Sequence, residues 1–261
     1  VSLGPESSTQ VAFTHYFMTA GPKVLHVEIQ VADDLPQDNR RSAALNIIER
    51  IKVLLVDGDP SAEWLRGDTD FIKLALTPFE ESQESKPKPK TSEKIEMKDL
   101  IEATSLTFEE FKKFNSLSEF SLVILANLQN LEAQKAKELE VFVENGGGVL
   151  ICAGNRMEID WYNDFWGSRG SNFLPMTIQG TQGNLQNELT YARISSSYFE
   201  HPALSMFNDP RNGSLAEALI KKWIVMDESK VRNDPLVTIL ARLSNGQPIL
   251  AEKKFGKGVV M

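Results

Sequence analysis

Several features are scarce in this sequence of 261 residues, and each scarcity excludes a class of protein. The chain has a single cysteine, Cys152, so it can form no internal disulfide. It has three histidines, and these are scattered, so no recognisable zinc-binding spacing is present. The sequence therefore predicts no metal site and no cofactor.

Long apolar runs and a basic excess are also lacking. The longest apolar stretches, residues 122–126 and 149–153, fall far short of the ~20 residues that a bilayer span needs. We therefore expect no transmembrane segment in this chain. A net charge of -8 gives no basic footprint for nucleic acid, and we expect no nucleic-acid partner. With 41% hydrophobic residues, the chain can still build a substantial core.

The motif Arg50–Ser61, RIKVLLVDGDPS, predicts the centre of the fold. Its apolar run Val53–Val56 has no polar face, which is typical of a strand covered on both sides in a parallel sheet. The turn Asp57-Gly58-Asp59-Pro60 ends that strand, and a helix is expected over residues 61–76 with Asp59 as its N-cap. This pattern predicts an α/β domain.

Further segments extend this domain. Leu122–Ala126 and Gly148–Ala153 are predicted to be buried strands adjacent and parallel to the first, and the helix Leu131–Glu144 connects them. Shorter elements are expected at 95–104 (strand), 108–114 (helix) and 159–166 (helix). Strands are also predicted at 176–180, 189–194, 223–226, 236–243 and 248–255, where Asn245-Gly246 indicates a hairpin.

The first part of the chain predicts a separate β region. Strand-like runs at 11–18 and 24–31 are expected to form a hairpin around Ala20-Gly21-Pro22, followed by a third strand at 42–48. We interpret residues 1–49 as the last strands of an immunoglobulin-like domain, and residues 50–261 as the α/β domain. Residues 77–94 are expected to be a mobile surface insertion, because they are polar and charged. Both chain ends look cut, so a longer natural protein is expected.

Two acidic residues after the first strand allow a catalytic interpretation. Asp57 and Asp59 have the D-x-D spacing of haloacid-dehalogenase phosphatases, in which two carboxylates can hold Mg²⁺. Ser61 stands where those enzymes place Thr or Val, and no later lysine and acidic pair follows. Capping of the following helix by Asp59 and Pro60 accounts for the same residues without catalysis.

The cysteine allows a second catalytic interpretation. Leu150–Arg156, LICAGNR, resembles the G-I-C-x-G-x-Q nucleophile elbow of class I glutamine amidotransferases, with Leu150 and Arg156 replacing the glycine and the glutamine. The single H-x-E pattern, His26-Val27-Glu28, lies upstream of the α/β region, and His201 is followed by proline and should begin a short helix. We therefore expect the α/β region to offer no histidine paired with a carboxylate. Cys152 is expected to be a largely buried side chain with no imidazole in reach.

Several motifs together resemble one bacterial family. These are DNRR, VLLVDGDPS, VILANLQNL, FVENGGGVLICAGNR, HPAL and LARLSNGQPILAEKKFGKGVV. They are similar to the glutamine-amidotransferase-like domain of membrane-anchored Bat-type (aerotolerance-related) proteins, which also carry a von Willebrand A domain. The resemblance implies a flavodoxin-like, mainly parallel sheet with an antiparallel C-terminal extension, preceded by an immunoglobulin-like segment and commonly lacking the catalytic triad.

The resemblance implies that the chain is a non-catalytic module that serves binding or assembly in a membrane-anchored envelope protein. Its partners would be other domains of the same parent chain or protein partners at the membrane. The alternatives are a hydrolase or amidotransferase using Cys152 and a Mg-dependent phosphatase using Asp57 and Asp59. A binding cleft is expected where the strand ends meet. Its candidate residues are Asp57, Asp59, Asn127, Gly154, Asn155 and Arg156.

Overall fold

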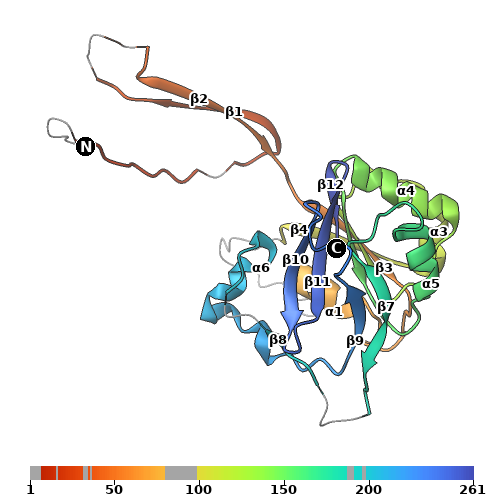
Figure 1. Ribbon diagram of the computed structural model, residues 1–261. Helices are drawn as coiled ribbons and strands as arrows, with labels where there is room; N and C mark the ends of the chain where they lie inside the picture. Colours follow the sequence, from red (N-terminus) through yellow and green to blue (C-terminus); the bar gives the residue numbers. More distant parts are fainter. Residues whose placement is uncertain are drawn as a thin grey trace. The chain divides into compact units, whose positions relative to one another are not determined.

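The computed structural model describes residues 7–15, 17–31, 35, 37–79, 99–186, 191–195 and 198–261. The chain divides into two compact units, Val1–Ile51 and Lys52–Met261, and each is described here by itself (Figure 1). Residues 80–94 of the insertion that was expected to be mobile lie outside the described residues.

The smaller unit contains a two-stranded antiparallel ribbon of β1 (Gly21–Glu28) and β2 (Arg40–Ile47). Gly21 pairs with Ile47 and Glu28 with Arg40. The hairpin expected between 11–18 and 24–31 is therefore wrong, because the second of these runs pairs with the third candidate strand. Gly21 and Pro22 belong to β1 instead of a turn. An outer strand tolerates proline because the missing N–H leaves no ladder bond unmade.

The larger unit is built on an eight-stranded mixed sheet in the order β4-β3-β5-β6-β12-β11-β10-β8. Its strands are β3 (Ile51–Asp57), β4 (Ile101–Thr107), β5 (Leu122–Ala126), β6 (Gly148–Cys152), β8 (Ile194–Ser195), β10 (Val237–Leu243), β11 (Pro248–Phe255) and β12 (Gly258–Val260). β5 lies between β3 and β6 and is parallel to both, with Leu122 opposite Val53 and Gly148. The predicted arrangement of these three buried strands is confirmed.

The other half of the sheet is antiparallel. β12 pairs parallel to β6, and then β11, β10 and β8 each pair antiparallel with the preceding strand. The predicted antiparallel extension and the Asn245-Gly246 hairpin are confirmed, and Gly246 has the positive φ of 86° that favours glycine. Of the strand expected at 189–194, only the end of the range lies in β8, and residues 187–190 lie outside the described part.

Side elements cover both faces of the sheet (Figure 1). They are the helices α1 (Asp70–Leu76), α3 (Phe108–Lys113), α4 (Ala133–Glu144), α5 (Ile159–Trp161) and α6 (Pro202–Ser205), the π-helical η1 (Tyr162–Trp166), the 3₁₀ turns η2 (Met206–Asn208), η3 (Pro210–Asn212) and η4 (Leu215–Glu217), and the antiparallel ribbon of β7 (Thr177–Gly183) and β9 (Lys222–Asp227). In β3, Leu54 and Val56 enter the core that includes α4, while Val53 and Leu55 enter the core that includes α1. This two-sided burial explains the uninterrupted apolar run in the sequence. Among the described residues, no helix has the length and apolar character to cross a membrane.

The first helix starts later than the sequence predicts. α1 begins at Asp70, and the residues from Ser61 to Thr69 form turns and bends, so Asp59 and Pro60 do not cap it. Leu65 has a φ of 58°, which interrupts helical geometry. The predicted helix after β5 is confirmed as α4, which is followed by Asn145 and by Gly146 with a φ of 111°.

Candidate functional site: a polar corner and an apolar slot

A cluster of polar side chains lies where β3, β5 and β6 end. We call it the Asn127 cluster, and it consists of Asp57, Asp59, Asp68, Asn127, Asn155 and Arg156. Parallel strands bring their carboxyl ends to one edge of the sheet, which is why residues far apart in sequence meet here. The structure brings all six residues predicted for a cleft to this edge: five belong to the Asn127 cluster, and Gly154 lies against Asn127.

Asp57 is buried at the end of β3, and it serves the backbone. One carboxylate oxygen accepts the N–H of Asp59 at 2.9 Å, and the other accepts the N–H and the hydroxyl of Thr69 at 3.0 and 2.8 Å. These bonds tie the loop that leads to α1 to the strand end. In the described part of the chain, no three His, Cys, Asp or Glu side chains gather where they could share a metal ion.

Asn127 holds the three strand ends together. Its side-chain amide donates to the carboxylate of Asp68 at 2.8 Å and to the side-chain oxygen of Asn155 at 3.0 Å. Its own side-chain oxygen accepts the backbone N–H of Arg156 at 2.9 Å. The residue is 7% exposed and has a left-handed φ of 54°, which asparagine tolerates better than most residues.

Two glycines allow the backbones to approach closely in this corner. A methyl group on Gly58 would lie 2.2 Å from the carbonyl oxygen of Asn127, and one on Gly154 would lie 2.1 Å from the Asn127 side-chain oxygen. Neither space can hold a side chain. Gly58 also donates its N–H to the carbonyl of Ala126 at 2.9 Å, which continues the β3–β5 ladder into the turn.

Arg156 faces the outer side of the cluster. Its guanidinium donates to Asp59 at 3.0 Å, and both side chains are substantially exposed. Asp68 and Thr69 also contribute. Neither is among the residues predicted from the sequence, because both lie in a stretch predicted to be helical. A loop that extends to the start of α1 at Asp70 would have to be predicted before Thr69 could be expected to bind Asp57.

Cys152 ends β6 beside this cluster. Its side chain is largely though not fully buried, and this burial raises the pKa of the thiol. It packs with Leu150 against the core that includes α1, and its backbone carbonyl accepts the N–H of Asn127 at 2.9 Å. Within the described residues its sulfur makes no hydrogen bond, and no imidazole reaches it. These surroundings are those of a weakly reactive thiol.

A histidine is nevertheless paired with a carboxylate in the larger unit. His201 Nε2 lies 3.3 Å from a carboxylate oxygen of Glu252, which is buried on β11. His201 Nδ1 accepts the N–H of Ala203 at 3.3 Å and so caps α6. The expectation that this region offers no such pair is wrong. An H-x-E search could not find it, because tertiary folding brings Glu252 from a distant strand.

An apolar slot opens next to Cys152. It is a cavity of about 280 Å³ between the end of β6 and the start of β11, and residues of the β7–β9 ribbon also line it. We call this cavity the slot. Its lining is formed by Leu150 to Ala153, Ile249 to Ala251, Met261, and apolar residues that include Ile178, Trp223 and Ile224.

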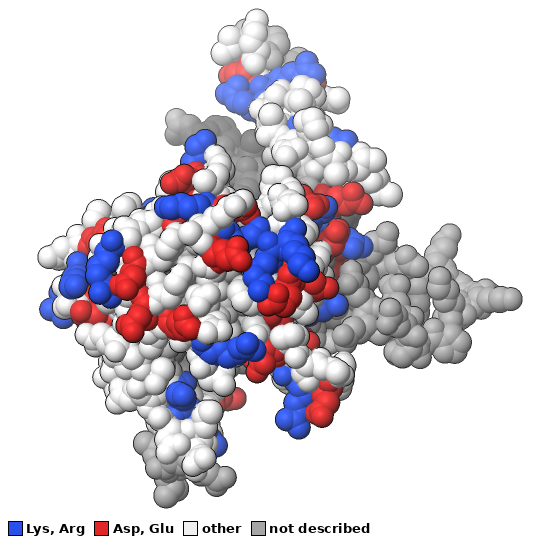
Figure 2. Space-filling view, turned by 90° about the vertical axis from the view of Figure 1, so that its right-hand side faces the viewer, with Lys and Arg blue, Asp and Glu red and all other residues white. Residues whose placement is uncertain are grey.

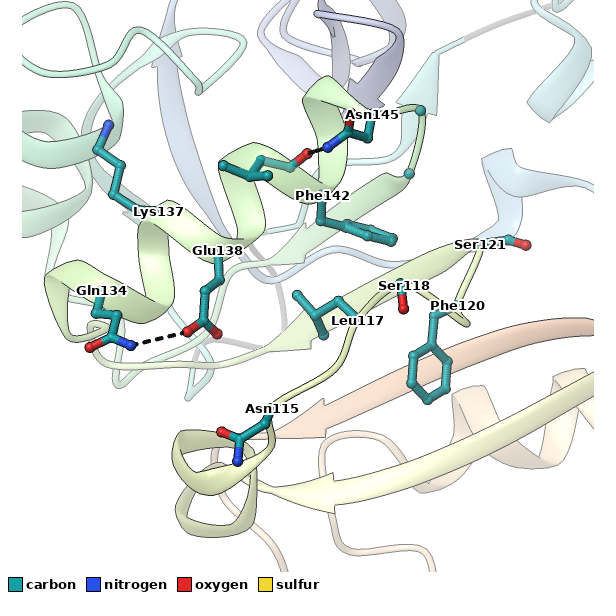
Figure 3. A pocket seen from close by; sticks show the side chains of 13 residues that line it. Asn115, Leu117, Ser118, Phe120, Ser121, Gln134, Lys137, Glu138, Phe142 and Asn145 are labelled. Carbon is teal, nitrogen blue, oxygen red and sulfur yellow. Dashed lines mark hydrogen bonds between the residues drawn. The ribbon is translucent and has the colours of Figure 1, made fainter.

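A second, wider hollow of about 770 Å³ lies at the opposite ends of the strands (Figure 3). Leu117, Phe120 and Phe142 supply its apolar surface, and Lys137 and Glu138 of α4 lie along its rim. A methyl group on Gly147 would lie 2.3 Å from the Phe142 ring, so this ring packs directly on the backbone before β6. The hollow is thus a gap between α4, with the turn that follows it, and the loop before β5.

The face around α4 carries charges of both signs (Figure 2). Lysines and glutamates alternate there, and the ion pairs Lys135–Glu138 and Lys137–Glu140 follow the i,i+3 spacing of the helix. In each pair one side chain is buried, Lys135 at 7% and Glu140 at 5% exposed, and its partner is exposed. Because both signs are mixed, this face offers no single-sign field to steer a charged partner.

No protein-family model matches the chain, and no curated protein matches it in sequence. Among solved structures, it is similar to a putative ThuA-like protein from Bacteroides uniformis, at 15% identity and a TM-score of 0.43 over 83% of this chain and 84% of the other. An exo-β-1,4-mannosidase from an Opitutaceae bacterium has 13% identity and a TM-score of 0.37 over 81% and 30%. The mmIFT52 N-terminal domain has 13% identity and a TM-score of 0.42 over 80% and 84%. All three scores are below 0.5, so the architecture above rests on the strand pairing itself.

Proposed function

We propose that this chain is a non-catalytic, amidotransferase-like module that serves binding or assembly within a larger, membrane-anchored bacterial envelope protein. The observation that carries the proposal is the self-contained Asn127 cluster. Asp57 and Asn127 use their polar atoms for backbone and side-chain partners inside the cluster. Polar groups that already bond to one another are not available to orient a substrate.

The strand order supports the amidotransferase-like part of the proposal. Counted along the chain, β3, β4, β5, β6 and β12 lie in the order 2-1-3-4-5, which is the order of flavodoxin-like sheets. Cys152 ends the fourth of these strands, as the resemblance to the amidotransferase elbow implies. A fold, however, does not by itself confer an activity.

The state of the thiol supports the non-catalytic part. A cysteine nucleophile needs a lowered pKa or an adjacent base, whereas burial raises the pKa of Cys152. The imidazole of His201 is engaged on both nitrogens, with Glu252 on one side and the α6 backbone on the other.

A thiol-dependent hydrolase is the second candidate, and the His201–Glu252 pair is the observation that favours it. A hydrolase would require the imidazole to leave the α6 backbone and reach the Cys152 thiol while Glu252 still orients it. A phosphatase using Asp57 and Asp59 is less well supported, since Asp57 binds Thr69 and Asp59 binds Arg156.

The test compares the purified chain with its Cys152→Ala and His201→Ala variants in glutamine hydrolysis, p-nitrophenyl acetate hydrolysis and p-nitrophenyl phosphate hydrolysis with Mg²⁺. We expect equal background rates for all three proteins. Turnover that disappears in both variants would overturn the proposal in favour of the hydrolase. Mg²⁺-dependent phosphate release that disappears in an Asp57→Asn variant would establish the phosphatase instead.

A further inference from the structure

A segment of the chain itself crosses the end of the sheet where open α/β folds leave a crevice for ligands. This segment, residues 58–69, is called the strap below. It leaves β3 and reaches Arg156, which follows β6, the second strand along from β3. It returns past Asn127 at the end of β5, and Thr69 then binds Asp57 at the end of β3. The strap therefore crosses the ends of three neighbouring strands.

The inner limb of the strap, residues 67–69, is firmly attached. Thr69 is 3% exposed and donates both its N–H and its hydroxyl to the buried carboxylate of Asp57. Asp68 accepts a hydrogen bond from the buried side chain of Asn127. Hydrogen bonds to charged groups away from water are among the stronger ones, so this limb stays in place when weaker contacts break.

The outer limb, residues 59–66, is weakly attached. The structure describes all of these residues, and none of them is buried; Trp64 is 76% exposed. The limb reaches across the strand ends through the ion pair of Asp59 with Arg156, whose side chains are 59% and 43% exposed. Exposed ion pairs add little stability and are screened by salt. Leu65 also has a left-handed φ of 58°, which is strained in leucine, so little holds this limb closed.

The ion pair places a carboxylate on the guanidinium of Arg156. Among the described residues a single hydrogen bond makes this contact, from Nη1 of Arg156 to Oδ1 of Asp59 at 3.0 Å. A carboxylate that approaches freely can bind a guanidinium through two parallel hydrogen bonds, which is the stronger arrangement. Asp59 therefore occupies a site whose chemistry suits a carboxylate ligand, and it does so in a weaker geometry than a free ligand can reach.

We propose that the outer limb of the strap is autoinhibitory: Asp59 stands in for an acidic side chain of a partner protein, and the limb must leave Arg156 before that side chain can bind. The inner limb stays attached and confines the movement to residues 59–66. This inference rests on the proposed binding role and adds the chemistry of the partner, a carboxylate presented on a peptide. A closed strap lowers the apparent affinity for the partner by the fraction of molecules that are open.

The first experiment measures the closure of the strap in the full chain by the rate of trypsin cleavage after Arg66, whose side chain is 73% exposed. Cleavage requires a loose outer limb, so its rate follows the population of the open strap. Arg156→Gln should raise this rate about two- to fivefold, the range that loss of an exposed ion pair supports. The charge swap Asp59→Arg with Arg156→Asp should restore the parent rate, and Pro60 prevents cleavage after the new arginine. An unchanged rate in Arg156→Gln would overturn the proposal.

The second experiment measures binding of acetyl-Gly-Asp-Pro-Ser-amide, a copy of residues 58–61, from NMR shifts of the backbone amides at positions 155 and 156. Asp59→Asn frees the guanidinium, so this variant should bind the peptide about two- to fivefold more tightly than the parent chain does. Arg156→Gln should abolish binding, as should asparagine in place of aspartate in the peptide.

Equal affinity of the parent chain and Asp59→Asn, or binding that persists in Arg156→Gln, would overturn the proposal. Tighter binding of succinate than of the peptide would overturn the assignment of the carboxylate to a partner protein. None of these readouts depends on hydrolysis, so failure of the autoinhibitory strap and failure of the non-catalytic role are distinguishable.

Discussion

The Asn127 cluster and the slot lie at neighbouring strand ends of the same sheet, yet they are packed in opposite ways. In the cluster, backbones and polar side chains approach so closely that Gly58 and Gly154 have no room for a methyl group. In the slot, apolar residues of β6, β11 and the β7–β9 ribbon surround a cavity of about 280 Å³. Cys152 lies between them: its carbonyl accepts the N–H of Asn127, and it is one of the residues that line the slot.

This difference shows why a strand end that resembles a catalytic elbow need not be one. An elbow exposes its nucleophile and leaves polar donors free for the reacting group. Here the donors at the strand ends are used to hold the strands together, and the open space beside the thiol is apolar.

The largest expected difference comes from enlarging one side chain in each region. Gly58→Ala would place a carbon 2.2 Å from the Asn127 carbonyl oxygen, so we expect a loss of about 3 kcal/mol or more in the free energy of unfolding. Ala153→Val at the exposed edge of the slot should cost within about 0.5 kcal/mol. Urea unfolding followed by circular dichroism measures both. Similar losses for the two variants would contradict the contrast between a closed cluster and an open slot.

The next effect concerns Asn127 itself. Asn127→Gly keeps the left-handed backbone and removes the side-chain bonds to Asp68, Asn155 and Arg156, which should cost about 1 to 3 kcal/mol. Asn127→Ala should cost about 1 kcal/mol more, because alanine is strained at a φ of 54°. The difference between the two variants in urea unfolding isolates the backbone term. An alanine variant as stable as the glycine variant would show that the positive φ is not maintained.

The smallest effect is the response of Cys152 to pH. Since burial raises the pKa of this thiol, its alkylation rate should rise with pH at a midpoint above that of the urea-unfolded chain. The unfolded chain loses the proton first, so the stability of the folded chain should fall as pH rises through the ordinary thiol pKa and beyond. Below that pH the thiol is protonated in both states, and its contribution to the free energy of unfolding is fully present. Cys152→Ala should lack this portion of the alkaline loss, and a midpoint below that of the unfolded chain would indicate an activated thiol.

Some features of the fold follow from local pattern. Val53–Val56 and Leu122–Ala126 are apolar at every position, which is typical of a strand covered on both faces. Asn245-Gly246 supplied a tight hairpin because glycine adopts the positive φ that the turn requires. Gly21-Pro22 also predicted a turn, but both residues lie in β1 and pair with β2. A turn-like sequence does not indicate which strand lies opposite.

The sequence by itself determined which segments are buried strands and that polar residues follow three of them. Only the tertiary structure decided what those residues do. Asp57 binds Thr69, Asp59 binds Arg156 instead of capping a helix, and His201 pairs with Glu252 on β11. Local patterns arise from the periodicity and conformational preferences of neighbouring residues, which a sequence displays. Hydrogen-bond partners and the size of the slot depend on which distant strands lie side by side. Only the tertiary fold brings the atoms of such distant residues within a few ångströms of one another.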